Sequence, residues 1–283
     1  MTEPGIVGIL LIVANIVFSY KGFTNELFFD GYKFEVDRIL VSKDYKRLIT
    51  SGFLHVSWTH LIFNMLSLLA FCGLLESNLG EIKFLIIYFA SLVGGDLLSL
   101  FIHRNHGDYT AVGASGAVCG VIFASIALFP GLNIGLLGIP LYIPSWLYGI
   151  LYVLISIYGI KSNKGNIGHD AHLGGALVGM IVALLLKPSA FIPNYLTILI
   201  IALPTVAFIC LIIARPHILL VDNFHFKTRA KAKVYSINRK PRKKKIDRQQ
   251  EIDSILDKIN THGMNSLSKS EKERLEQFSK TGQ

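Results

Sequence analysis

The residues best suited to chemistry are Gly113-Ala114-Ser115-Gly116, at the head of an apolar run that ends near Pro130. The flanking glycines leave the hydroxyl of Ser115 unshielded, and the apolar run predicts a buried helix that begins there. At a helix N-terminus, unpaired N–H groups and the helix dipole favour a developing negative charge. This arrangement suits a serine nucleophile whose oxyanion is stabilised by adjacent backbone. The simpler explanation is that small residues let membrane helices pack closely.

A polar pair lies within an earlier apolar window. His60 and Asn64 are four residues apart, so on a helix they point to the same side, one turn apart. Polar side chains within a membrane span usually face a protein interior or a watery cavity, which makes them candidates for function. A hydrogen bond between two helices, which Asn and His both make in membranes, explains the pair equally well.

A histidine and a glycine face begin a later apolar window. Gly175 and Gly179 form a small-xxx-small face that lets another helix approach closely. His172 lies within about one turn of this face, so it is well placed to reach a hydroxyl on the partner helix. We expect the neighbouring His169 and Asp170 to be cap or interface residues.

Membrane-spanning helices must position these residues, because the composition is that of a membrane protein. Of the 283 residues, 52% are hydrophobic and 17% are charged, and the mean hydropathy is +0.49. We count about seven apolar windows, and several approach the roughly 20 residues that span a bilayer, while those at 5–19 and 170–187 are short. They cover residues 5–19, 57–75, 82–102, 112–129, 141–160, 170–187 and 194–214. The first lacks a basic n-region and a cleavage site, so we expect a retained span.

The positive charge is concentrated in the C-terminal tail. Residues 1–214 hold 11 Lys+Arg and 11 Asp+Glu, whereas residues 215–283 hold 17 and 8 and account for the net charge of +9. Anionic lipid headgroups are candidate partners of the tail, at roughly 1 kcal/mol per basic residue near the surface. No nucleic acid is expected, because the tail has little aromatic interleaving and no recognised module.

No metal or cofactor is predicted. The three cysteines, Cys72, Cys119 and Cys210, fall in different apolar windows and lack the spacing of metal ligands. They are most simply small apolar packing residues.

Together the three motifs resemble the rhomboid family of intramembrane serine proteases. His60-Leu-Ile-Phe-Asn64 matches the HxxxN of the family's second core helix, and Gly113-Ala-Ser115-Gly116 matches the GxSG of its fourth. Ala171-His172 with Gly175-xxx-Gly179 matches the histidine and glycine face of the sixth. The resemblance covers about residues 1–187. It implies an all-α, polytopic membrane fold with a six-transmembrane-helix core.

The resemblance also implies the roles of the site residues. Ser115 would be the nucleophile and His172 its general base, with no third carboxylate. His60, Asn64 and the backbone N–H of Ser115 would donate to the oxyanion. One departure concerns the base: the family often has an aromatic residue one turn after the serine, and here that position is Cys119. Another lies in the first loop, where the family's Trp-Arg pair appears as Lys46-Arg47.

The tail raises a question of topology. Under the family topology a seventh span would place the basic tail outside, whereas positive charge favours the cytoplasmic side. A hairpin or interfacial helix at 189–214 would return the tail inside, but we favour a true span. Ser268-Lys-Ser-Glu271 is a capping-box pattern that predicts a short helix in the tail. The expected parts are a catalytic core at 1–187, a seventh transmembrane segment at 188–216, a basic linker at 217–250 and a small helical tail at 251–283.

These features predict an intramembrane serine endopeptidase that acts through a Ser-His dyad. Its partners would be the lipid bilayer and single-span or multi-pass membrane proteins, which it would cut in or next to transmembrane segments. Hydrolysis needs water, so a water-filled cleft must reach Ser115. We expect a bacterial cytoplasmic membrane, because the start lacks an organelle-type transit segment.

Two other functions compete with this hypothesis. A non-catalytic rhomboid-like protein would bind the transmembrane helices of clients without cutting them. Such relatives usually lack the serine or the histidine, and both are present here. A small transporter would use the polar pairs as a substrate path, but no inverted repeat is evident in the sequence.

Overall fold

The computed structural model describes residues 5–135, 142–162 and 168–214, together with Lys258, Ser268 and Glu271. Residues 1–224 and 225–283 form two separate units. The helices of the first unit are α1 (Ile6–Thr24), α2 (Glu26–Tyr32), α3 (Val36–Leu40), α4 (Arg47–Thr50), η1 (Ser51–Phe53), α5 (Trp58–Leu79), α6 (Glu81–His103), α7 (Ser115–Leu128), α8 (Ser145–Ser162), α9 (His169–Leu186), η2 (Pro188–Ala190) and α10 (Phe191–Ala214).

Each of the seven apolar windows holds a helix, which confirms an all-α, polytopic membrane fold. In the described part of the chain, five helical segments are long and apolar enough to cross a membrane: α1, α5, α6, α9 and η2 with α10. α7 and α8 are shorter apolar helices. The only strands in the described ranges form two short antiparallel pairs, β1 (Phe34–Glu35) with β2 (Thr110–Ala111), and β3 (Asn133–Gly135) with β4 (Tyr142–Pro144).

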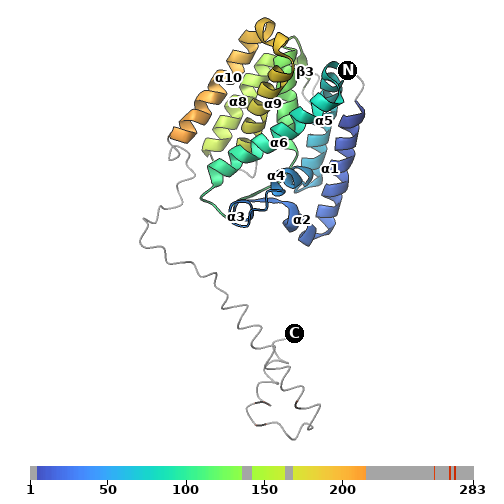
Figure 1. The fold of residues 1–283 in the computed structure, drawn as a ribbon, viewed down its shortest axis with the longest axis vertical. Helices are drawn as coiled ribbons and strands as arrows, with labels where there is room; N and C mark the ends of the chain where they lie inside the picture. The colour runs from blue at the N-terminus through green and yellow to red at the C-terminus, as the bar shows by residue number, and fades with distance from the viewer. Residues whose placement is uncertain are drawn as a thin grey trace. The chain divides into compact units, whose positions relative to one another are not determined.

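α7 is the buried centre of the helical bundle. Every residue of α7 after Ser115 is buried, and α7 packs on both α6 and α9. Around this centre α1 packs on α5, and α10 packs on α8 at the opposite side of the bundle (Figure 1). The 14 residues of α7 rise about 21 Å, less than the roughly 30 Å of the hydrocarbon core. At least one end of α7 must therefore lie within the membrane.

The polar segment between α1 and α5 is ordered, a point that the sequence did not decide. The buried guanidinium of Arg47 donates hydrogen bonds to the carbonyls of Asp30 (3.0 Å) and Lys33 (2.6 Å). β1, from this segment, pairs with β2, which lies shortly before α7. The carbonyl of Ser51 accepts a hydrogen bond from the N–H of Gly113 at 3.0 Å. The segment therefore covers the end of the bundle where α7 begins.

The expected seventh segment is a continuous helix, α10, with Pro204 inside it. Near its start, the side-chain amide of Asn194 donates to the carbonyls of Ala127 (2.9 Å) and Leu128 (3.1 Å). These are two of the last carbonyls of α7, which have no intrahelical partner. α10 is therefore tied to the C-terminal end of the serine-bearing helix.

Most of the predicted basic linker and helical tail lies outside the described residues. Ser268 and Glu271 form the capping box that the sequence predicts: the N–H of Glu271 donates to Ser268 Oγ at 3.3 Å, and the N–H of Ser268 donates to Glu271 Oε2 at 2.7 Å. Lys258 Nζ also lies 3.1 Å from Glu271 Oε1. The two bonds with Ser268, followed by that with Lys258, lower the pKa of Glu271 to about 2.

A buried carboxylate joins α1 to α5. Glu76, near the end of α5, accepts hydrogen bonds from the N–H groups of Val7 (3.0 Å) and Gly8 (2.9 Å) in the first turn of α1. A carboxylate at a helix N-terminus also interacts favourably with the helix dipole. The two helices are therefore antiparallel and are fastened where α1 begins.

Replacing Glu76 with Gln should weaken this attachment. Hydrogen bonds to a charged group are each worth about 2 kcal/mol, and Gln presents an NH₂ donor toward one of the two N–H groups. We expect a lower midpoint of thermal unfolding in detergent. Asn78→Ala, at an exposed position in the same turn, is the matched control. Equal midpoints for Glu76→Gln and Asn78→Ala would contradict this role.

Candidate active site

A cavity of about 1030 Å³ takes side chains from α5, α7, α8 and α9. Among its lining residues are all four predicted chemical groups, with the two glycines that flank the serine: His60, Asn64, Gly113, Ser115, Gly116 and His172. Gly175 and Gly179 are outside the lining and pack α9 against α7. The structure therefore brings the three sequence motifs to one place. The cavity also fits the cleft that hydrolysis beside Ser115 would need.

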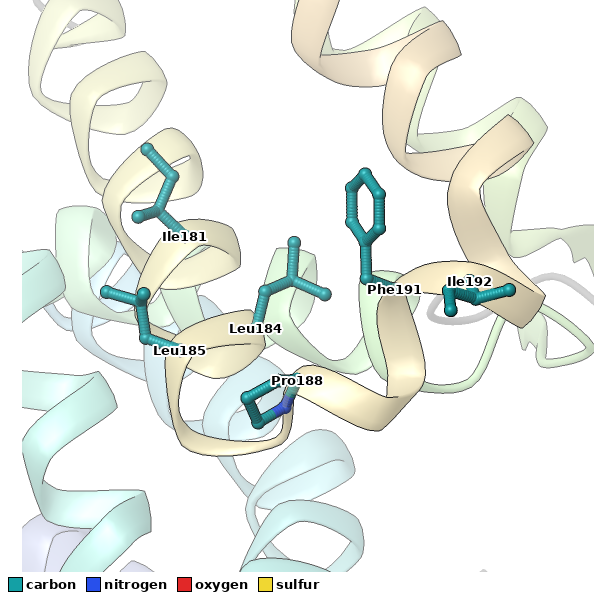
Figure 2. Close-up of a pocket in the computed structure, with 6 residues that line it drawn as sticks. All are labelled: Ile181, Leu184, Leu185, Pro188, Phe191 and Ile192. Atoms are coloured by element: carbon teal, nitrogen blue, oxygen red, sulfur yellow. The ribbon is translucent and has the colours of Figure 1, made fainter.

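A second cavity, of about 510 Å³, lies between the end of α9 and the start of α10. Figure 2 shows its six apolar lining residues, Ile181, Leu184, Leu185, Pro188, Phe191 and Ile192. None of these side chains carries a nucleophile or a titratable group. The candidate catalytic groups therefore all line the larger cavity.

The turn before Ser115 requires a glycine. Gly113 has a φ of +132°, a conformation that residues with a side chain rarely adopt. A Cβ at this position would lie 2.8 Å from His60 Cε1 and 3.7 Å from Ser115 Oγ. His60 and the serine hydroxyl thus share the space that Gly113 leaves open. Ser115 is the first residue of α7, so its N–H belongs to the turn that lacks intrahelical acceptors.

His172 reaches this region because α9 and α7 touch backbone to backbone. A Cβ on Gly175 would lie 2.1 Å from the carbonyl oxygen of Gly116, and one on Gly179 would lie 2.4 Å from the Cα of Gly120. His172 precedes Gly175 by about one turn. Among the described residues no hydrogen bond joins Ser115 Oγ to His172. Such bonds are often long in a free enzyme and shorten when substrate binds.

His60 and Asn64 lie on the cavity side of α5, as their spacing predicts. The buried side-chain amide of Asn64 donates to the carbonyl of His60 at 3.0 Å. His60 Nδ1 is buried and has no hydrogen-bond partner within the described ranges. Both side chains therefore line the same cavity as Ser115.

His55 is a site residue that the sequence analysis did not single out. It is fully buried, and its Nε2 accepts a hydrogen bond from the N–H of Ala114 at 3.4 Å. Its Nδ1 lies 2.8 Å from Ser19 Oγ, whose own proton goes to the carbonyl of Phe53. Nδ1 must therefore carry the ring proton. His55 holds the residue before Ser115, and its ring packs edge-on against His60. The available signal in the sequence was its position just before the apolar window that contains His60 and Asn64.

Asp170 is not a helix cap, which corrects one of the two roles expected for it. The N-cap of α9 is Gly168, and the Asp170 carboxylate is buried 3.0 Å from His103 Nε2 on α6. The His103 ring stacks on Tyr109 with 3.6 Å between ring centroids. This pair fastens α9 to α6 two residues before His172.

Tyr152 on α8 is a second site residue that the sequence analysis missed. Its Oη lies 3.0 Å from His172 Nδ1 and 2.9 Å from Cys119 Sγ. The side chain that touches the histidine thus comes from α8, although the family pattern often has an aromatic at the position of Cys119. Tyr148 and Tyr152 are four residues apart, and this spacing on one helix face was the only available signal.

Gly175→Ala should separate α9 from α7, because the added methyl group would overlap the carbonyl of Gly116. We expect the protein to insert in the membrane while Ser115 loses reactivity toward a fluorophosphonate probe. The matched control is Gly131→Ala, because a Cβ at Gly131 meets nothing within 4 Å. Full probe reactivity of Gly175→Ala would show that the close helix contact is not needed.

His55 predicts a dependence of stability on pH. Burial, with a smaller contribution from His60, lowers the pKa of His55 from 6.5 to about 3. The unfolded chain therefore binds a proton that the folded protein does not, and stability must be lost as the pH falls from about 6.5 toward 3. Across this window we expect the midpoint of thermal unfolding to fall more steeply for the wild type than for His55→Asn. Parallel curves would contradict the prediction.

Comparisons with known proteins match the part of the chain that contains these residues. A model described as the Rhomboid domain matches residues 42–189, just over half of the chain. A second model, described as a family of unknown function (DUF6576), matches residues 235–281.

Several curated proteins are similar to this chain. RHOMBOID-like protein 12, mitochondrial, of Arabidopsis thaliana is 28% identical over 192 residues, and the match covers 62% of this chain and 56% of that protein. Rhomboid protein 1, mitochondrial, of Saccharomyces cerevisiae is 32% identical over 157 residues, and the match covers 53% of this chain and 45% of that protein. Rhomboid protease GluP of Bacillus subtilis is 26% identical over 162 residues, and the match covers 57% of this chain and 30% of that protein. The chain thus spans about half the length of the first two.

Proposed function

This chain belongs to the rhomboid family, and we propose that it is a serine endopeptidase that cuts membrane proteins in or next to their transmembrane segments. The observation that carries the proposal is the shared cavity, which Ser115, His172, His60 and Asn64 all line. The chain is a multi-pass membrane protein, and we propose a bacterial cytoplasmic membrane as its location. Its similarity to a Bacillus subtilis protease supports this location.

In the proposed reaction, Ser115 Oγ attacks the carbonyl carbon of the substrate's scissile peptide bond. His172 Nε2 takes the hydroxyl proton and later gives it to the leaving nitrogen. Water then hydrolyses the acyl-enzyme, with His172 again acting as the base. The cavity beside Ser115 supports this step, because water must reach a serine that lies inside the bundle.

The negative charge on the substrate's carbonyl oxygen needs donors that are already in place. The N–H of Ser115, in the first turn of α7, is one candidate. The side chains of His60 and Asn64 are the others, and Asn64 would turn its amide from the His60 carbonyl toward the oxyanion. Removing one such donor typically costs ~10²–10³ in rate.

The substrate is proposed to be a membrane-protein segment that leaves its helical conformation at the cleavage site. An intact helix hides its backbone carbonyls, so small or helix-destabilising residues near that site would favour cutting. Phe63 of α5 and Tyr148 of α8 both line the cavity, and Phe63 is largely exposed. We propose that a substrate segment approaches between these two helices.

The first test is labelling of the purified protein with a fluorophosphonate probe, with the modified residue identified by mass spectrometry. We expect labelling on Ser115 in the wild type and none in Ser115→Ala or His172→Ala. In bilayers, the wild type should cleave a single-span model substrate, and both variants should lose turnover. The expected loss is complete, because each residue performs a chemical step that no other group replaces.

The opposite result would favour the non-catalytic interpretation. A well-folded wild type that fails to label in bilayer and in detergent would point to a protein that binds transmembrane helices without cutting them. Co-purification of the intact model substrate with wild type and Ser115→Ala alike would support that function.

A further inference from the structure

Within the described part of the chain, Tyr152 makes the only hydrogen bond to the ring of His172. We propose that Tyr152 is a positioning residue that fixes the tautomer and orientation of this histidine. The inference rests on the proposed protease function, in which His172 is the base. Tyr152 would then provide from α8 the support that a carboxylate provides in a soluble Ser-His-Asp triad.

The position of the ring proton follows from the role of His172. A base that accepts the Ser115 proton at Nε2 must have that nitrogen free, so a neutral His172 carries its proton on Nδ1. Nδ1 lies 3.0 Å from Tyr152 Oη, and the N–H therefore donates to the phenol oxygen. Once Nε2 is protonated, the same hydrogen bond stabilises the charged ring. In the other tautomer Nε2 would hold a proton and could not act as the base.

Tyr152 is itself held in place from α7. Its hydroxyl lies 2.9 Å from Cys119 Sγ, one turn after Ser115, so the hydroxyl proton can point to the sulfur while the oxygen accepts from His172. The phenol ring packs edge-on against Phe123 at 5.6 Å and stacks with Tyr148 at 6.0 Å between ring centroids. The series Cys119, Tyr152, His172 therefore connects three helices around the base.

The size of the effect follows from the kind of acceptor. Replacing the carboxylate that orients the histidine in soluble triads by its amide lowers turnover by ~10⁴. A neutral phenol accepts a hydrogen bond about half as strong as a charged group does. We therefore expect Tyr152→Phe to lower kcat by about tenfold to a hundredfold. KM should stay unchanged, since this hydroxyl is engaged with His172 and Cys119.

The experiment compares Tyr152→Phe with Tyr158→Phe in vesicles that contain a single-span model substrate. Tyr158 is on the same helix but is exposed and outside the cavity lining, so its variant controls for the loss of a phenol oxygen from α8. The expected result is a lower kcat for Tyr152→Phe alone. Equal kcat values for Tyr152→Phe and wild type overturn the proposal.

A second measurement does not depend on turnover. Nitrogen-15 spectra of histidine-labelled protein distinguish an Nδ1–H from an Nε2–H ring, and the signal that disappears in His172→Ala identifies the residue. We expect Nδ1–H in the wild type and a shift toward Nε2–H in Tyr152→Phe. An unchanged tautomer overturns the proposal. If Ser115 of the wild type fails to label, the protease function is wrong, and the nitrogen spectra alone decide the role of Tyr152.

The part played by Cys119 is tested by a double-mutant cycle. If the thiol acts only through the Tyr152 hydroxyl, Cys119→Ala should lower kcat in the wild type and have no further effect in Tyr152→Phe. Additive losses would show that Cys119 acts on the site by another route and would overturn the proposed series.

Discussion

The close contact of α7 with α9 is the constraint on which the site depends. Lipid tails are as apolar as the helices, so burial of apolar surface does little to hold helices together, and tight van der Waals packing must do so. Gly175 against Gly116, and Gly179 against Gly120, bring the two backbones into direct contact. α6 joins them, because a Cβ on Gly95 would lie 2.5 Å from the carbonyl of Ala171. The residues before these glycines, Ser115 and His172, are consequently brought to the same end of the bundle.

Buried polar groups also hold neighbouring elements together. Glu76 fastens α1 to α5, and Asp170 with His103 fastens α9 to α6. Arg47 orders the segment that covers the start of α7, and His55 joins that segment to the serine turn. Each of these groups satisfies backbone or side-chain partners that would otherwise be unpaired away from water. The buried polar residues thus act together with the glycine contacts in specifying which elements of this membrane protein meet.

The sequence alone predicted the features that depend on residues close together in the chain. The apolar windows predicted the seven helices, and the Ser268 capping box depends on residues three apart. The motif residues were identified by type and spacing, but their roles stay predictions. His55 and Tyr152 were missed because their importance comes from partners 59 and 20 residues away. For Asp170, proximity to a helix start suggested a cap or an interface residue, and its partner on α6 makes it an interface residue.

α7 is secured at both of its ends. His55 accepts from the N–H of Ala114 at the start, and Asn194 donates to the carbonyls of Ala127 and Leu128 at the finish. These hydrogen bonds at its two ends resist both translation of α7 along its axis and rotation about it. The outer helices α5 and α8 carry many exposed apolar side chains. The proposed oxyanion donors lie on α5, and Tyr152 lies on α8. A substrate that separated these two helices would therefore displace groups around Ser115, while the backbone that carries Ser115 stayed in place.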